Sequence, residues 1–120
     1  MDLQTRSHLP ELRERLLRRH SELQYEVRAA SEALHDQERG ADVRDSKDEA
    51  DLRQRVTGED LQLARDLAEL QDVEDALGRL AAGSYGDCAG CGAAIPAARL
   101  AVQPAARLCT ACQSQLETRR

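Results

Sequence analysis

Four cysteines are the residues whose type and spacing point most directly to chemistry in this sequence. They form two CxxC pairs, Cys88–Cys91 and Cys109–Cys112, with seventeen residues between the pairs. Two residues between the cysteines of a pair allow one tight turn to direct both sulfurs at a single ion. The spacing predicts one structural Zn²⁺ ion in a closed site of four thiolates.

Other interpretations of the cysteines are weaker. Iron also suits four sulfurs, so the spacing does not separate zinc from iron. Disulfides require an oxidising compartment, which nothing in the sequence indicates, and a redox dithiol needs only one CxxC pair. Because protein ligands fill all four positions, no place remains for a catalytic water. The three histidines form no visible constellation, and we expect no enzyme.

The second feature is an acidic stretch over residues 42–51. It contains five acids against two basic residues: Asp42, Asp45, Asp48, Glu49 and Asp51 against Arg44 and Lys47. Ser46 and Glu49 fit a capping box, in which a serine caps a helix and a glutamate three residues later reaches back. Capping and solubility alone would explain the acids, which then mark the start of a helix.

Two apolar stripes flank the acidic stretch. Their members recur in steps of mostly three and four residues, as in an amphipathic helix: Leu9, Leu12, Leu16, Leu23, Val27, Ala30 and Leu34, then Val56, Leu63, Leu67, Leu70, Val73, Leu77 and Leu80. Joined by the polar segment 40–51, the helices predict an antiparallel coiled-coil hairpin. Pairing about the tip places Leu34 near Leu61, Leu23 near Val73 and Leu16 near Leu80.

Composition limits the remaining possibilities. The 120 residues include two tyrosines but neither Phe nor Trp, 32% are charged, and the net charge is −5. A large aromatic core is excluded, and the negative balance argues against non-specific DNA or RNA binding. No apolar run is long enough to cross a membrane, and the first residues lack the apolar core of a signal peptide. We expect a cytoplasmic protein.

The expected organisation is mainly α-helical. Residues 1–83 form the hairpin, with its tip at about 41–51, and Gly83 caps the second helix. Residues 84–120 form a small zinc-ribbon-like C4 module with a short C-terminal helix. Tyr85 is expected to pack on this module or on the hairpin ends, and Ile95, Leu100 and Leu108 to cluster under the metal. So small a module needs the metal for most of its stability.

Several segments of the sequence resemble a known protein family. The segment 83–96 (GSYGDCAGCGAAIP), then Arg99-Leu100, Pro104-Ala105 and Cys109-Thr-Ala-Cys-Gln113, resembles the DksA/TraR family of C4-type zinc-finger proteins. In addition, the stretch from Asp45 to Ala50 (DSKDEA) matches the DxxDxA pattern of the coiled-coil tip in DksA. Together these matches cover about residues 9–118.

The resemblance implies a bacterial transcription factor that binds RNA polymerase and not DNA. Such proteins insert the coiled-coil tip through the secondary channel toward the active centre. The matching tip residues are Asp45, Asp48 and Ala50, and Arg65 matches a basic position that supports polymerase contact. DksA also binds ppGpp through basic side chains, at positions occupied here by Asp72, Gln103 and Gln113. We therefore predict weak or absent ppGpp dependence.

Three alternatives stay open from the sequence. The chain could be a zinc-stapled coiled-coil adaptor for another protein. It could promote transcript cleavage by polymerase, as the Gre factors do with two acidic residues at a coiled-coil tip. A nucleic-acid-binding zinc ribbon is disfavoured, because the basic surplus after Ser84 is only two and a zinc tetrathiolate adds about −2.

Overall fold

The fold is mainly helical, as the sequence predicts. The computed structural model describes residues 1–40 and 46–119, with side chains described for 1–36, 58 and 60–119. Within these residues the helices are α1 (Leu3–Ser7), α2 (Leu9–Gly40), α3 (Ser46–Ala82), α4 (Ala97–Val102) and α5 (Thr110–Thr118). The same residues contain no β-strand, only an isolated antiparallel bridge between Asp87 and Ala94.

The chain divides into two compact units. The zinc unit comprises Met1–His20 and Asp72–Arg120, and the hairpin unit comprises Ser21–Gln71. This division groups residues by packing, whereas the boundary expected after Gly83 separates the two long helices from the cysteine module by sequence. That boundary stays a prediction.

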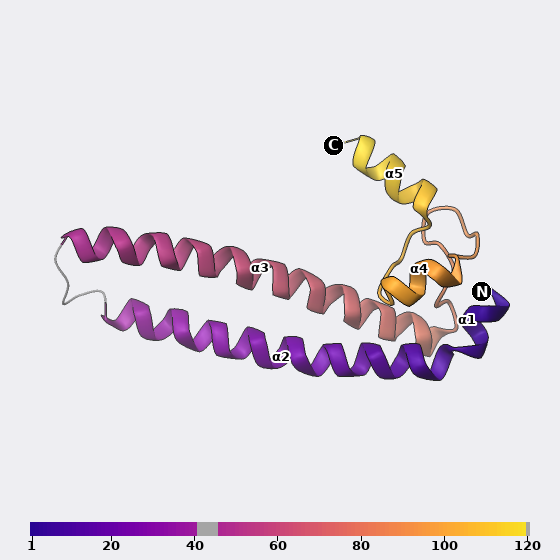
Figure 1. Cartoon of the computed structure of the whole chain (residues 1–120), viewed down its shortest axis with the longest axis horizontal. Helices are drawn as coiled ribbons and strands as arrows, with labels where there is room; N and C mark the ends of the chain where they lie inside the picture. Colours follow the sequence, from indigo (N-terminus) through magenta and orange to yellow (C-terminus); the bar gives the residue numbers. More distant parts are fainter. Residues whose placement is uncertain (41–45, 120) are drawn as a thin grey trace. The chain divides into compact units, whose positions relative to one another are not determined.

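In the hairpin unit, α2 and α3 run antiparallel and side by side (Figure 1). Leu23 is fully buried and Leu34 is 8% exposed, so both α2 leucines predicted for the seam are confirmed. The same stripe continues in the zinc unit with Leu12 and Leu16, which are 5% and 2% exposed. The steps of three and four residues in α2 thus mark its buried face correctly.

The predicted stripe of α3 needs one correction. Leu67 is 48% exposed, and Asp66 lies in the seam instead with 8% exposure. Alternating steps of three and four residues back from Val73 reach Leu70, Asp66 and Leu63, so helical phase places Leu67 one position off the seam. Leu61, which was expected beside Leu34, is 58% exposed and does not fill the seam. The Gln62 amide donates a hydrogen bond to Asp66 Oδ1 at 3.0 Å.

The second long helix ends where the sequence predicts. Gly83 has a φ of 82°, a left-handed conformation that favours glycine. Its N–H donates to the Leu80 carbonyl, and the Ser84 N–H donates to the Arg79 carbonyl. This pair of bonds is the Schellman motif, which satisfies two of the last carbonyls of α3 and turns the chain into the cysteine module.

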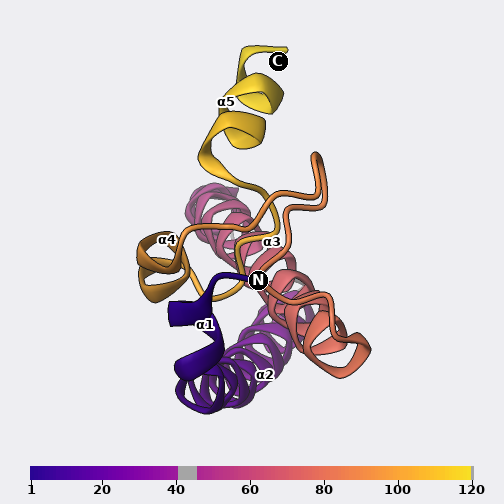
Figure 2. The same ribbon diagram turned by 90° about the vertical axis from the view of Figure 1, so that its right-hand side faces the viewer.

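The core of the zinc unit is small and apolar. Tyr85, Ile95 and Leu100 are at most 1% exposed and Leu108 is 7% exposed, so the three residues predicted to cluster under the metal are all buried. The helix α1, capped by the Asp2 carboxylate on the Gln4 N–H, contacts α4 (Figure 2). A separate property concerns membranes: among the described residues, no helix combines the length and apolar character needed to span one.

Candidate functional site

The four cysteines converge on one point of the zinc unit. Their Sγ atoms all lie within 4.8 Å of one another, and the Cys91 and Cys109 sulfurs are 3.9 Å apart. Zinc–sulfur bonds of about 2.3 Å in a tetrahedron place sulfurs about 3.8 Å apart. The four sulfurs therefore have the spacing of a tetrahedral metal site before any ion is considered.

Two tight backbone structures aim the sulfurs. In the first, the Cys88 N–H donates to the Ala93 carbonyl and the Gly92 N–H donates to the Cys88 carbonyl, which closes a turn around Cys91. In the second, Cys109 is the N-cap of α5 and Cys112 lies in the first helical turn. The two CxxC pairs thus use a loop turn and a helix start to present their thiolates.

The close approach of Cys112 explains why the first CxxC pair has a glycine at position 90. A Cβ atom at this position would lie 3.1 Å from Cys112 Sγ and 3.3 Å from its Cβ. Such distances are tighter than ordinary contacts, and the crowding would push one ligand away from the others. The absence of a side chain at Gly90 lets the two CxxC pairs approach each other.

Backbone N–H groups stabilise negative charge on one sulfur. The N–H groups of Cys109 and Gly90 each donate to Cys88 Sγ at 3.3 Å. These bonds, with that from Cys109 the strongest, lower the pKa of the Cys88 thiol to about 6. Hydrogen bonding with the sulfurs of Cys109, Cys88 and Cys91 raises the pKa of Cys112 to about 12. Zn²⁺ binds cysteine as the thiolate, so zinc binding releases the protons that the sulfurs share in hydrogen bonds.

The donor set, its geometry and its hydrogen bonds fit zinc. Four thiolates suit a soft or borderline ion, and N–H···S bonds are the usual outer contacts of such a site. The cysteines Cys88, Cys91, Cys109 and Cys112 form a C4 zinc-binding site, as the sequence predicts. With four protein ligands the bound ion is closed to substrate, and the chemistry it supplies is structural.

Three side chains hold the chain around α4: one arginine from each long helix, and Tyr85 from the loop that follows α3. Arg15 Nη1 from α2 donates to the Ala101 carbonyl at 2.8 Å, and Arg79 Nη2 from α3 donates to the Ala105 carbonyl at 3.4 Å. Between them, the Tyr85 hydroxyl donates to the Pro104 carbonyl at 2.7 Å. We call these three contacts the carbonyl clasp. It ties the segment that leads to the second CxxC pair to both long helices.

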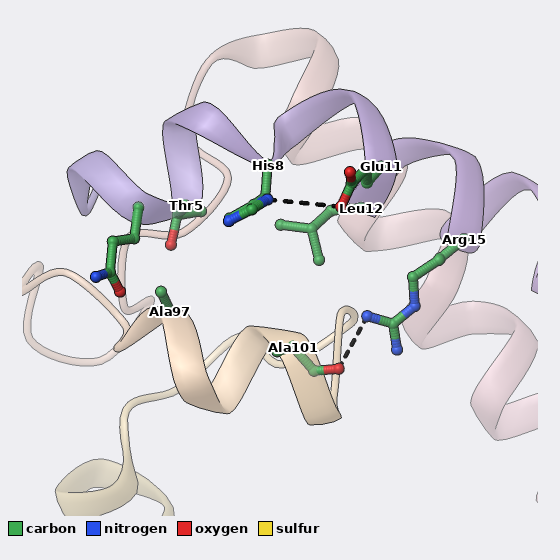
Figure 3. Close-up of a pocket in the computed structure, with 8 residues that line it drawn as sticks. Thr5, His8, Glu11, Leu12, Arg15, Ala97 and Ala101 are labelled. Carbon is green, nitrogen blue, oxygen red and sulfur yellow. Dashed lines mark hydrogen bonds and ion pairs between the residues drawn. The ribbon is translucent and has the colours of Figure 1, made fainter.

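A hollow of about 210 Å³ lies beside the clasp, between α4 and the start of α1 and α2 (Figure 3). His8, Glu11 and Arg15 face it from one side, and the small side chains of Ala97 and Ala101 form the α4 side. His8 Nδ1 pairs with Glu11 Oε2 at 3.5 Å across its upper wall. Neither these residues nor the clasp arginines were predicted from the sequence, because no short motif marks them.

The hydroxyl of Thr5, which lines the hollow, is unusual because it is buried and unpaired. The residue is 1% exposed, and its hydroxyl is the buried side-chain polar atom that lacks a hydrogen-bond partner in the part of the chain that the structure describes. Its methyl group lies toward Gly86, at 3.5 Å from where a Cβ of residue 86 would be. An unpaired buried hydroxyl costs about 1–3 kcal/mol.

The predicted partner-binding residues lie away from the metal site in the sequence. Asp45 falls outside the described residues, whereas Asp48 and Ala50 belong to α3 but their side chains are outside the described part. The helix begins at Ser46, where the capping box predicts a helix start. Arg65 is an exposed residue of α3 in the hairpin unit.

The positions matched to the ppGpp contacts of DksA all lie in the zinc unit. Asp72 and Gln103 are exposed, and Gln113 is half-buried. The Gln113 side-chain amide donates to Glu117 Oε1 at 3.1 Å. A second carboxylate therefore stands next to one of these positions.

Comparison with known proteins now identifies the fold. Residues 83–117 match the profile of the prokaryotic dksA/traR C4-type zinc finger. The structure of transcription factor DksA2 from Pseudomonas aeruginosa superposes with a TM-score of 0.79 at 32% sequence identity, over 94% of this chain and 85% of that chain. No curated protein matches by sequence. The chain therefore belongs to the DksA/TraR family of C4-type zinc-finger proteins.

Proposed function

We propose that this protein regulates transcription initiation by binding RNA polymerase directly, with the coiled-coil tip inserted into the secondary channel. The family and the fold indicate a transcription factor. The observation that carries the finer proposal is the likeness to transcription factor DksA2 over nearly the whole chain, which includes the long helical pair as well as the zinc finger.

The acidic tip is the proposed effector. Asp45, Asp48 and Ala50 match the DxxDxA pattern, and the stretch 42–51 concentrates five of the 22 acids of the chain. The secondary channel admits anionic nucleotides and ends at metal ions and basic residues, so an acidic probe is electrostatically complementary to it. Arg65 is proposed as a supporting polymerase contact on α3.

The zinc unit is proposed to act with little or no help from ppGpp. A tetra-anionic ligand requires clustered Arg or Lys side chains. Asp72, Gln103 and Gln113 supply none, and Glu117 adds negative charge at 3.1 Å from the Gln113 amide. If ppGpp enhances the effect of this protein on a ribosomal promoter as strongly as it enhances that of DksA, this part of the proposal is wrong.

The protein is proposed to have no catalytic activity of its own. The C4 site offers no open metal position, and direct binding to bare DNA is disfavoured by the charge of −5. Two outcomes would favour the alternatives. Cleavage of transcripts in stalled elongation complexes would point to a Gre-like role, and recovery of other proteins without polymerase subunits would point to an adaptor.

The direct test is co-purification with core RNA polymerase, followed by crosslinking from position 47. Crosslinks to the walls of the secondary channel are expected. Asp48→Asn should then abolish the effect on transcription in vitro while polymerase binding and folding stay close to those of the original protein. Asp60→Asn, which removes an exposed acid elsewhere on α3, is the matched control and should leave activity intact. If Asp48→Asn retains full activity, the acidic residues of the tip serve only to cap the helix, and this part of the proposal is wrong.

A further inference from the structure

One peptide group connects a charged side chain to the cysteine cluster. The peptide between Leu108 and Cys109 donates its N–H to Cys88 Sγ at 3.3 Å. Its carbonyl, that of Leu108, accepts a hydrogen bond from Arg99 Nε at 3.0 Å. The C=O and N–H of a trans peptide lie in one plane and point in opposite directions. The guanidinium, the peptide and the Cys88 sulfur therefore form one chain of hydrogen bonds.

The fold fixes both ends of this chain. Arg99 is a half-buried residue of the short helix α4, and its neighbour Leu100 is fully buried. At the other end Cys88 is 3% exposed. The Ala89 N–H donates to the Arg107 carbonyl at 2.8 Å, which holds the segment before the second CxxC pair beside the first pair. The guanidinium thus acts on the sulfur from a fixed position.

The charge of the metal site explains what such a chain can do. Zn²⁺ with four thiolates carries a net charge of about −2. Hydrogen bonds in a chain polarise one another, so a cation on the carbonyl of a peptide makes its N–H a stronger donor. Hydrogen bonds that involve an ionised group are also shorter and stronger than neutral ones. Arg99 is therefore placed to strengthen the N–H···S bond on Cys88 and to offset part of the negative charge.

We propose that Arg99 is a positioning residue of the zinc site, which acts on Cys88 through the peptide between Leu108 and Cys109. We call this arrangement the peptide relay. It holds the second CxxC pair against the first and reduces the electron donation of the Cys88 sulfur to the metal. Hydrogen-bond partners of metal ligands typically contribute about 10–100-fold to metal affinity. Loss of the Arg99 guanidinium should therefore speed the release of zinc.

Two other arginines of the zinc unit provide the contrast. Arg79 Nη2 also donates to a backbone carbonyl, that of Ala105, at 3.4 Å. The N–H of that peptide belongs to Ala106 and donates to the Gln103 carbonyl, so it does not reach a sulfur. Arg107 is exposed and lies two residues before the second CxxC pair. Arg79 thus matches the guanidinium–carbonyl bond, and the Arg107 side chain matches the charge, without the relay.

The test uses the full chain and measures two properties of the loaded metal site. Zinc release is followed by transfer to a chromogenic chelator, and Co²⁺-loaded protein is examined by absorption spectroscopy. Arg99→Leu should release zinc about tenfold faster or more. Its sulfur-to-cobalt charge-transfer band should move to longer wavelength, because a thiolate with a weaker hydrogen bond donates electrons more readily. Arg99→Lys, which restores a charged donor, should recover part of both effects.

The controls are Arg79→Leu and Arg107→Leu, in which the cobalt band should stay in place. If Arg99→Leu releases zinc at the original rate, the peptide relay is refuted. If it releases zinc faster with an unshifted band, or if Arg79→Leu shifts the band equally, Arg99 serves folding alone and the inference is wrong. Should Arg99→Leu fail to bind metal, Arg99→Gln, which keeps an N–H donor without the charge, carries the test. A shifted band in Arg99→Gln supports the relay, and an unshifted band refutes it.

Discussion

At the scale of single residues, Tyr85 shows how the zinc unit joins side-chain burial to backbone satisfaction. The ring is 1% exposed and the hydroxyl donates to the Pro104 carbonyl at 2.7 Å. Tyr85→Phe keeps the ring but leaves this carbonyl without its donor. The free energy of unfolding should fall by about 1 kcal/mol, measured by urea denaturation of the zinc-loaded protein. Tyr25→Phe, at a 75% exposed position, should change nothing.

Burial also raises the pKa of Tyr85 above its ordinary value of 10, against the opposing effect of Arg79 and Arg15. A raised pKa in the folded state means that the stabilisation by Tyr85 is complete below about pH 10 and is lost as the pH rises through the folded value. The original protein should therefore lose stability above pH 10 more steeply than Tyr85→Phe. Parallel curves for the two proteins in this range would contradict the assignment.

Thr5 is the opposite case, a buried hydroxyl without a described partner. Thr5→Val keeps the branched shape and removes the unpaired polar atom. We expect the free energy of unfolding to rise by about 1 kcal/mol, measured by the same urea titration. The control is Thr118→Val, whose hydroxyl donates to the Ser114 carbonyl at 2.8 Å on the exposed helix α5, and which should bring no gain. A clear loss of stability in Thr5→Val would mean that its hydroxyl has a partner in solution.

At the scale of elements, the seam of α3 carries a charged residue that the hairpin could do without. Asp66 is 8% exposed, and Gln62 of the same helix is its hydrogen-bond donor. Asp66→Leu replaces a buried carboxylate by an apolar side chain at a seam position. The melting temperature, followed by circular dichroism at 222 nm, should rise, for a gain of about 1–2 kcal/mol. Asp60→Leu, at an exposed position of the same helix, should leave it unchanged.

The elements also show what could be predicted from sequence. The two CxxC pairs and the α2 stripe can be predicted from sequence because their patterns are local: two residues lie between paired ligands, and steps of three and four residues separate the leucines. The apolar steps of α3 predict Leu67 in the seam, whereas the helical phase counted from Val73 places Asp66 there, and the exposed fractions of the two side chains follow the helical phase. The carbonyl clasp could not be foreseen, since Arg15 and its acceptor Ala101 are 86 residues apart. No spacing rule connects residues so distant.

At the scale of the whole molecule, the two units should differ in their need for metal. The zinc unit has few large buried side chains around the cysteines, so the ion supplies much of their order. Removal of zinc by a strong chelator should abolish amide-exchange protection between residues 84 and 112. Protection should persist in the buried seam of the hairpin unit, around Leu23 and Leu34. Equal loss of protection in both units would contradict this division, and Cys91→Ser should reproduce the effect of the chelator.

Zinc loading of the whole protein should release protons, with a direction set by the thiols. The Cys88 pKa of about 6 means that this sulfur is largely a thiolate at pH 7, whereas the Cys112 pKa of about 12 means that Cys112 keeps its proton until zinc displaces it. Zinc affinity should therefore rise with pH, by about a hundredfold or more between pH 6 and pH 8 in a chelator competition, because each proton released per ion contributes about tenfold per pH unit. Calorimetry in buffers of different protonation enthalpy should count at least one proton released per ion at pH 7. Cys112→Ser should release fewer protons, and an affinity independent of pH would show that the four sulfurs do not share protons in this way.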